Sequence, residues 1–177
     1  MGHETDRYMS LQIVIADAGP LIGLARIDSL QLLQQLFGHV YITATIHAEI
    51  LPQAGLFPDM RTLARTMAEG WIEIADEPHE KRPRLNPGVD IGEASAIDLA
   101  CHWQEQGKPV LLIMDDRVGR LEAKTAGIPA LGTAGIIGLA KEMGLIPDAR
   151  ALLMQLKQAG FYISEKHIDI ILRSVGE

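Results

Sequence analysis

The chain of 177 residues is long enough to bury one sizeable core, and its hydrophobic content of 47% excludes general disorder. The net charge of −7 argues against a protein that binds nucleic acid through a broad basic surface. No apolar run approaches the roughly 18 residues that a membrane-spanning helix needs. The single cysteine, Cys101, excludes an intrachain disulfide, and we expect a protein of the reducing cytoplasm with no membrane partner.

Predicted strands and helices alternate along the chain. Short apolar runs bounded by turn residues predict strands over 11–16, 40–42, 71–74, 110–114 and 129–131. Caps, prolines and glycines predict helices over 20–27, 29–37, 59–69, 90–106, 117–126, 133–143, 148–159 and 164–174, and Thr43 caps a further helix before Pro52. This order predicts an α/β fold with a parallel sheet and right-handed crossovers.

The chain divides into three predicted segments. Residues 1–10 are polar and lack the apolar core of a signal peptide, so we interpret them as a leader. Residues 11–145 form the α/β domain, and residues 146–177 form a helical pair packed on the same domain. Residues 75–89 are the one long loop, and a loop of this length within a compact domain is usually functional or disordered.

Carboxylates follow two of the predicted strands. Asp17 comes after a largely apolar run and precedes Gly19 and Pro20, which places it where a buried strand passes into a helix. Asp115 and Asp116 follow the second run in the same way. Ligands of open α/β sheets bind at the carboxyl ends of the strands, so these side chains converge if the two strands are neighbours.

Each of these acids also has a structural interpretation. Asp17 could stabilise its own turn. One residue of the pair Asp115 and Asp116 is expected to cap the following helix, which leaves the other, by preference Asp115, at the strand end. Adjacent like charges favour a bound cation or a shared proton.

Two further acids lie on predicted helices. Glu49 could face the sheet, or it could be an ordinary exposed residue. Glu93 completes a capping box with Asp90, and it also stands on the helix face of Ile97. Asp98 points elsewhere, and we interpret it as a surface residue.

A ring of carboxylates at one sheet edge offers hard oxygen ligands. Such ligands suit Mg²⁺ or Mn²⁺ rather than zinc or copper. The chemistry that uses such a site is metal-assisted hydrolysis of phosphodiesters. We therefore expect Asp17, Glu49, Glu93 and Asp115 to hold the metal and to be catalytic, with Asp116 as a fifth participant.

The ordered set of motifs resembles the PIN-domain family over roughly residues 11–145. The motifs are Asp17-Ala-Gly-Pro-Leu-Ile, Thr43-x-x-x-x-x-Glu49, Gly92-Glu93-Ala-x-Ala-Ile97, Leu112-Ile-Met-Asp115-Asp116-Arg-x-Gly-Arg120 and Gly132-Thr133. The closing helices also look like one PIN-like branch. The resemblance implies a three-layer α/β/α sandwich with a central parallel sheet of about five strands. It further implies a Mg²⁺- or Mn²⁺-dependent ribonuclease, often the toxin of a bacterial toxin–antitoxin pair and often a homodimer.

Basic and hydroxyl residues near the fourth motif are candidates for binding substrate. Arg117 and Arg120 could meet an RNA phosphate through charge-assisted bonds, or they could be helix-surface charges. Thr133 caps the helix after the last strand and, by the resemblance, supports the site. In the long loop, Lys81, Arg82 and Arg84 could follow an RNA backbone, but a solvated run of charge is the simpler account (residues 79–84).

Three functions remain open at this stage. The leading hypothesis is a metal-dependent ribonuclease that acts on RNA and pairs with an antitoxin protein. Many family members carry a hydroxyl residue after the first aspartate, where this chain has Ala18-Gly19. That departure, with the acidic charge, motivates a catalytically degenerate PIN-like module that binds a protein partner. A Mg²⁺-dependent phosphatase of small phosphate esters is the third possibility.

Overall fold

The computed structural model describes residues 12–53 and 56–177, so the predicted leader over 1–10 lies outside the described residues. The strands are β1 (Ile13–Ala16), β2 (Val40–Thr43), β3 (Ile72–Ala75), β4 (Val110–Ile113) and β5 (Ala130–Leu131). The helices are α2 (Ala18–Arg26), α3 (Gln31–Phe37), α4 (Ala44–Ile50), the short 3-10 helix η1 (Leu51–Gln53), α5 (Pro58–Met67), α6 (Ile91–Glu105), α7 (Arg117–Thr125), α8 (Thr133–Glu142), α9 (Ala149–Gln158) and α10 (Glu165–Ser174). Their bounds differ from the predicted ones by one or two residues at most ends.

The strands form one five-stranded sheet in the order β3-β2-β1-β4-β5. Every pairing is parallel, and the register sets Ala16 beside Ile113 and Thr43 beside Ala75. The central strand β1 is fully buried from Val14 to Ala16, as a parallel strand covered on both faces must be. The predicted parallel sheet is confirmed, and its order places the carboxyl ends of β1 and β4 next to each other.

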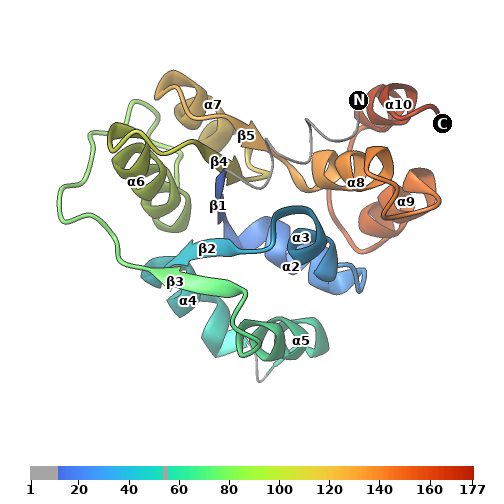
Figure 1. Cartoon of the computed structure of the whole chain (residues 1–177), viewed down its shortest axis with the longest axis horizontal. Coiled ribbons are helices and arrows are strands. Elements are labelled where there is room, and N and C mark those ends of the chain that lie inside the picture. Colours follow the sequence, from blue (N-terminus) through green and yellow to red (C-terminus); the bar gives the residue numbers. More distant parts are fainter. Residues whose placement is uncertain (1–11, 54–55) are drawn as a thin grey trace.

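Helices cover both faces of the sheet and complete the predicted three-layer α/β/α sandwich. On one face α6 contacts β1, β2 and β4. On the other face α3 contacts β2, and α8 packs against α2 and α3. Figure 1 shows α6 on one side of β1, with α2 and α3 on the opposite side. No helix in the described ranges is long and apolar enough to cross a membrane.

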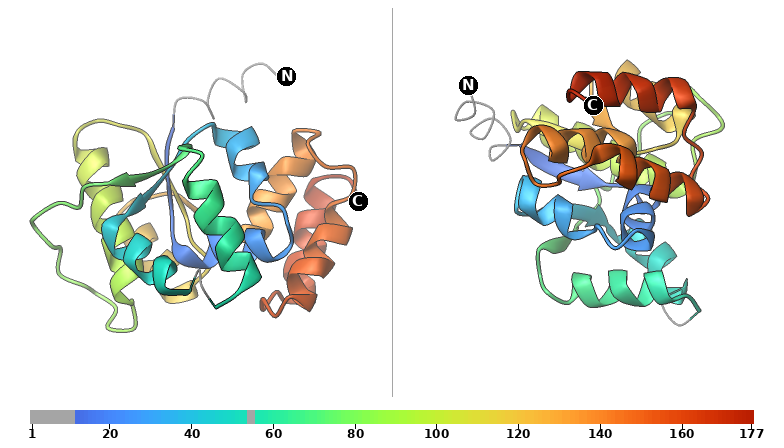
Figure 2. Two further views of the ribbon diagram at one scale, coloured as in Figure 1. Left: turned by 90° about the horizontal axis from the view of Figure 1, so that it is seen from below. Right: turned by 90° about the vertical axis from the view of Figure 1, so that its right-hand side faces the viewer.

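The two C-terminal helices pack on the same body. α9 contacts α8 and α2, while α10 contacts α8 and α9 (Figure 2). The last residue closes this arrangement, because the Glu177 side chain accepts hydrogen bonds from the Ala149 and Arg150 backbone N–H groups at 3.0 and 3.1 Å. Glu177 also pairs with Lys141 at 2.7 Å, and these contacts lower its pKa to about 2.

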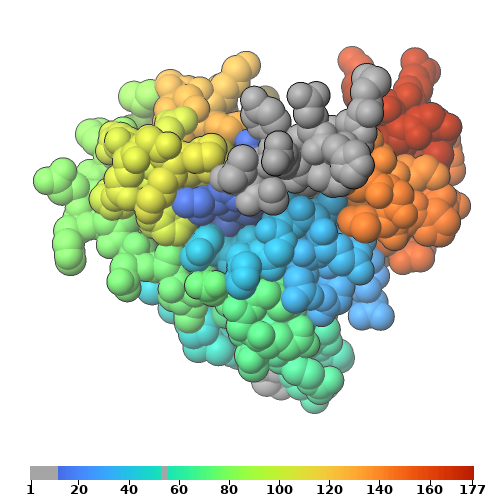
Figure 3. Space-filling view, in the orientation of Figure 1, coloured from blue at the N-terminus to red at the C-terminus, as the bar shows by residue number. Residues whose placement is uncertain are grey.

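The long loop and the C-terminal helices lie at opposite ends of the molecule. In the space-filling view the loop between β3 and α6, in light green, projects on one side, and α9 and α10, in orange and red, lie on the other (Figure 3).

Candidate active site

Asp17 stands at the junction of β1 and α2. Its backbone N–H donates to the Ile113 carbonyl at 2.9 Å, which continues the β1–β4 pairing by one residue. The residue is only 9% exposed. The pKa of Asp17 is raised to about 7, chiefly by burial. A hydrogen bond from the Ala18 N–H lowers it, and the nearby charges of Glu93, Asp90 and Glu49 raise it further. A carboxyl group therefore lies buried at the predicted strand end.

Glu93 lies in the first turn of α6. Its carboxylate accepts from the Asp90 N–H at 3.1 Å, and the Asp90 carboxylate accepts from the Glu93 N–H at 2.8 Å. The predicted capping box is thus confirmed, and Glu93 is also only 5% exposed. The pKa of Glu93 is raised to about 7, chiefly by burial. The hydrogen bond from the Asp90 N–H lowers it, and the charges of Asp90, Asp116 and Glu49 raise it further.

Glu49 reaches the same place from α4. The predicted cap of this helix is confirmed, because Thr43 Oγ1 accepts from the Ile46 N–H at 3.1 Å. Glu49 is exposed, and its Oε2 would lie 3.0 Å from a Cβ atom added at Gly92, in the first turn of α6. Partial desolvation by the surrounding protein atoms, followed by the charge of Asp90, raises the pKa of Glu49.

These four residues form what we call the acidic cluster: Asp17, Glu49, Asp90 and Glu93. The sequence identified Asp90 only as a helix cap, so its place among the charges was missed. Within the described ranges no lysine, arginine or histidine forms an ion pair with Asp17 or Glu93. The cluster thus concentrates negative charge at the end of β1.

Asp116 and Asp115 have different roles. Asp116 caps α7, with its Oδ1 accepting from the Val118 and Gly119 N–H groups at 2.6 and 2.9 Å, as predicted for one member of the pair. The negative charge of Asp116 also raises the pKa of Glu93. Asp115 faces α8 instead, so the structure does not place its carboxylate inside the acidic cluster.

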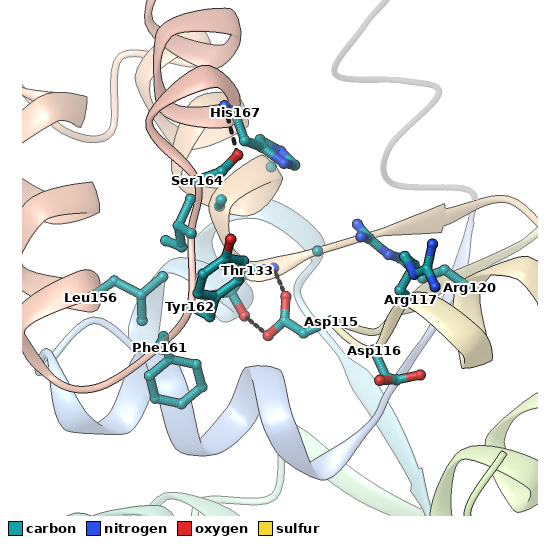
Figure 4. A pocket seen from close by; sticks show the side chains of 14 residues that line it. Asp115, Asp116, Arg117, Arg120, Thr133, Leu156, Phe161, Tyr162, Ser164 and His167 are labelled. Carbon is teal, nitrogen blue, oxygen red and sulfur yellow. Dashed lines mark hydrogen bonds between the residues drawn. The ribbon is translucent and has the colours of Figure 1, made fainter. Parts of the chain in front are cut away.

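Thr133 holds both oxygens of Asp115. The Thr133 N–H donates to Oδ1 at 2.7 Å, and the Thr133 hydroxyl donates to Oδ2 at 2.6 Å (Figure 4). The prediction that Thr133 caps α8 is wrong, because Gly132 occupies the cap position and the Thr133 hydroxyl is used by Asp115. A Cβ atom at Gly132 would lie 2.9 Å from Asp115 Oδ1, so a larger residue there would displace the Asp115 carboxylate from its present position.

The donor chemistry of the site suits a hard divalent cation. Carboxylate oxygens predominate, and the pKa values of Asp17 and Glu93 are raised first by burial and then by neighbouring negative charges, which a cation would offset. As the side chains stand, no group of three or more acidic, histidine or cysteine residues in the described part of the chain is arranged to hold a metal ion. The residue types therefore suit Mg²⁺ or Mn²⁺, but their side chains do not converge on one point as the ligands of a bound ion would.

A cavity of about 550 Å³ opens beside Asp115. The predicted substrate residues Arg117, Arg120 and Thr133 all line it. Its remaining wall comes from α9, the segment after it and α10, including Tyr162 and His167, which the sequence did not suggest. The structure thus brings the fourth acidic motif and the C-terminal helices to one pocket.

The basic residues of the long loop are neutralised by acids of the same chain. Lys81 pairs with Glu77 at 2.7 Å, and Arg82 pairs with Glu105. Arg84 pairs with Asp98 at 2.5 Å. The interpretation of these three residues as a solvated run of charge is wrong for Arg84, and none of them is left as an unpaired cation for an RNA backbone.

Asp98 is buried, which corrects its interpretation as a surface residue. It is only 2% exposed, and besides the Arg84 pair it accepts from the Arg82 N–H at 3.3 Å. The loop reaches over this face of α6 and supplies the partners. Sequence spacing within α6 could not reveal them, because they come from another segment.

Comparison with known proteins identifies the family. The PIN-domain family model DUF3368 matches residues 13–177, so the chain belongs to this PIN-domain family, whose members are generally nucleases. No curated protein matches the sequence significantly. Among solved structures, the chain is similar to a PilT N-terminus domain protein from the hyperthermophilic archaeon Sulfolobus solfataricus, with 14% identity, a TM-score of 0.48, and coverage of 87% of this chain and 98% of that chain.

Proposed function

We propose that the protein is an endoribonuclease that hydrolyses RNA phosphodiester bonds with the help of Mg²⁺ or Mn²⁺. The observation that carries the proposal is the acidic cluster, in which burial and neighbouring charges raise the pKa of Asp17 and of Glu93 to about 7. Strongly perturbed carboxyl groups of this kind gather at functional sites. Membership of a family of nucleases that typically depend on divalent metals supports the same reaction.

The residues that would hold the metal are the four predicted acids Asp17, Glu49, Glu93 and Asp115, with Asp116 at the border. When bound, a divalent ion supplies a water of lowered pKa and offsets charge on the phosphate. The chain itself contributes orientation, because Thr133 fixes both oxygens of Asp115. Arg117 and Arg120 lie on the same side and can bind a phosphate through charge-assisted bonds.

Metal binding and cleavage test the proposal together. Mn²⁺ is titrated by calorimetry into the wild type, into the double variant Asp17→Asn/Asp115→Asn, and into Glu142→Gln as a control at an exposed acid of α8. We expect binding in the wild type and control only. RNA cleavage in Asp17→Asn is expected to fall by about 100- to 1000-fold, a loss on the scale of removing one catalytic electrostatic group. Undiminished cleavage by Asp17→Asn would contradict the mechanism.

The same measurements separate the competing functions. Hydrolysis of p-nitrophenyl phosphate with Mg²⁺, without RNA cleavage, would favour the small-molecule phosphatase. Absence of metal binding and of both activities would favour the protein-interaction module, for which the Ala18-Gly19 departure is the motivating feature.

The role of a toxin with an antitoxin partner, acting in the cytoplasm as a homodimer, is a further part of the proposal and depends on the family resemblance. Expression of the wild type in a bacterial host is expected to arrest growth, whereas Asp17→Asn is expected to be tolerated. Sedimentation of the purified protein measures the oligomeric state. Equal growth with both forms would argue against a toxin that acts through RNA cleavage.

A further inference from the structure

The cavity beside Asp115 has a wall that the carboxylate chemistry does not explain. Three residues after α9, namely Tyr162, Ile163 and Ser164, line it together with His167 of α10. Asp115 and the two arginines of α7 line the other side. Metal-assisted hydrolysis needs none of the C-terminal residues, so their place in the lining of the cavity must have a different explanation.

Tyr162 is 96% exposed, and the residues on both sides of it are anchored. The adjacent Phe161 packs closely on α2, since a Cβ atom at Gly23 would lie 3.1 Å from its ring. The Arg26 guanidinium also lies 5.6 Å from the centre of that ring. On the other flank Ser164 caps α10 by accepting from the His167 N–H at 3.2 Å. An aromatic ring is thus presented to solvent from a segment that is anchored on both sides.

The arginines of the opposite wall keep their charge available. None of the ion pairs among the described residues involves Arg117 or Arg120, in contrast to the three paired cations of the long loop. Arg120 reaches the start of α8, because its Nη1 would lie 3.3 Å from a Cβ atom at Gly132. Figure 4 shows both arginines on one side of Asp115 and Tyr162 on the other.

We propose that this cavity binds one nucleotide of single-stranded RNA, with the base stacked on Tyr162 and a phosphate held by Arg117 and Arg120. The inference rests on the proposed function, because it places a substrate nucleotide next to Asp115. The volume of about 550 Å³ lies within the usual range for small-ligand sites. Stacking on an aromatic ring needs an unpaired base, which excludes a continuous duplex from this position.

Binding is measured by fluorescence anisotropy with a fluorescein-labelled pentauridine RNA. All proteins carry Asp17→Asn, which prevents cleavage during the titration. Tyr162→Ala is expected to weaken binding about tenfold, as loss of one base–aromatic stack does, whereas Tyr162→Phe keeps the ring and is expected to bind like its parent. The pair Arg117→Ala/Arg120→Ala is expected to weaken binding and to reduce its salt dependence. Arg61→Ala, at an exposed arginine of α5, serves as the control.

A photochemical measurement locates the base directly. A pentanucleotide with a central 5-iodouridine is irradiated in complex with the Asp17→Asn protein, and the adduct is mapped by mass spectrometry. We expect the adduct on Tyr162. An adduct elsewhere, combined with unchanged binding by Tyr162→Ala, would overturn the inference.

The outcome is separable from that of the proposed function. If the wild type cleaves RNA while Tyr162→Ala binds normally, the nuclease stands and the nucleotide site is refuted. If binding depends on Tyr162 but the wild type cleaves no RNA, the nucleotide site stands and the nuclease is refuted.

Discussion

Two groups of acidic side chains experience opposite surroundings. The acidic cluster at the first turn of α6 contains Asp17, Glu49, Asp90 and Glu93, and the pKa values of Asp17, Glu49 and Glu93 are raised. The second group, which we call the loop-anchoring acids, consists of Glu77, Asp98 and Glu122. These three hold the loop between β3 and α6 against the helices.

The loop-anchoring acids are supplied with donors. Glu122 accepts from the Leu85 and Asn86 N–H groups at 3.0 and 3.1 Å and from Asn86 Nδ2 at 2.6 Å, and these bonds lower its pKa against the effect of burial. Burial alone would raise the pKa of Glu77, but hydrogen bonds from Lys81 and Thr45 lower it. Burial raises the pKa of Asp17 and of Glu93 by more than their hydrogen bonds lower it. For Glu77 and Glu122 the hydrogen bonds outweigh burial, so these two acids stabilise the fold in their charged form.

Among single substitutions, the largest expected effect on stability comes from breaking a loop-anchoring pair. Arg84→Met leaves Asp98 buried without its cation, and removing one partner of a buried pair costs about 3 kcal/mol in the free energy of unfolding. Urea unfolding measures this value, with Arg61→Met as the matched control. A cost below ~1 kcal/mol would show that the Arg84–Asp98 pair does not behave as a buried one.

The acidic cluster predicts an unusual pH dependence for the metal-free protein. Asp17 and Glu93 have pKa values of about 7 in the folded state, so between pH 5 and pH 8 the folded chain releases protons that the unfolded chain has already lost. Each of the two groups is therefore expected to lower the free energy of unfolding by about 2–3 kcal/mol as the pH rises over this range.

The loop-anchoring acids predict the reverse dependence at lower pH. The lowered pKa values of Glu77 and Glu122 give stability that is present above their ordinary pKa and is lost as the pH falls through the folded value. Urea unfolding with EDTA at several pH values measures both trends. Stability that is constant or rising between pH 5 and pH 8 would contradict the account of the acidic cluster.

A single substitution isolates one member of that cluster. Asp17→Asn removes a buried charge, and at pH 8 it is expected to raise the free energy of unfolding of the metal-free protein by about 1 kcal/mol. It should also reduce the decline between pH 5 and pH 8. Glu142→Gln is the control and should change neither. A destabilised Asp17→Asn protein would mean that the carboxylate serves the fold.

The smallest expected effect concerns one donor of the loop. Asn86→Ala removes the side-chain bond to Glu122 but keeps the two backbone bonds, so we expect a loss of about 0.5–1 kcal/mol. Hydrogen exchange of the Leu85 and Asn86 amides is the local readout and should become faster. Unchanged exchange would indicate that the backbone bonds alone hold the loop.

Local signals in the sequence predicted most of the fold and part of the site. The apolar run before Asp17, the box formed by Asp90 and Glu93, and the cap at Asp116 each depend on residues within four positions. The structure therefore shows these features where the sequence indicated them. The parallel sheet followed from the alternation of strands and helices along the chain.

Partners distant in the sequence could not be predicted. Asp98 was misread because its cation, Arg84, comes from a loop whose path no local pattern encodes. The Thr133 hydroxyl was assigned to a cap because nothing in the sequence shows that Asp115 lies within its reach. No sequence pattern pointed to Tyr162, because a single exposed aromatic residue can be linked to a binding site only when the cavity beside it is known.

The order of the strands also bears on how the protein is made. β1 lies between β2 and β4, so Ile13 pairs with Val110, a residue that leaves the ribosome much later. Contacts between distant segments form late in folding, and a growing chain can complete β1 only after β4 has emerged. A ribosome-bound chain thus carries Asp17 through most of its synthesis without Asp115, and still longer without Tyr162. If the protein is the proposed ribonuclease, its site stays incomplete beside the messenger that encodes it until the segment that carries Tyr162 has been made.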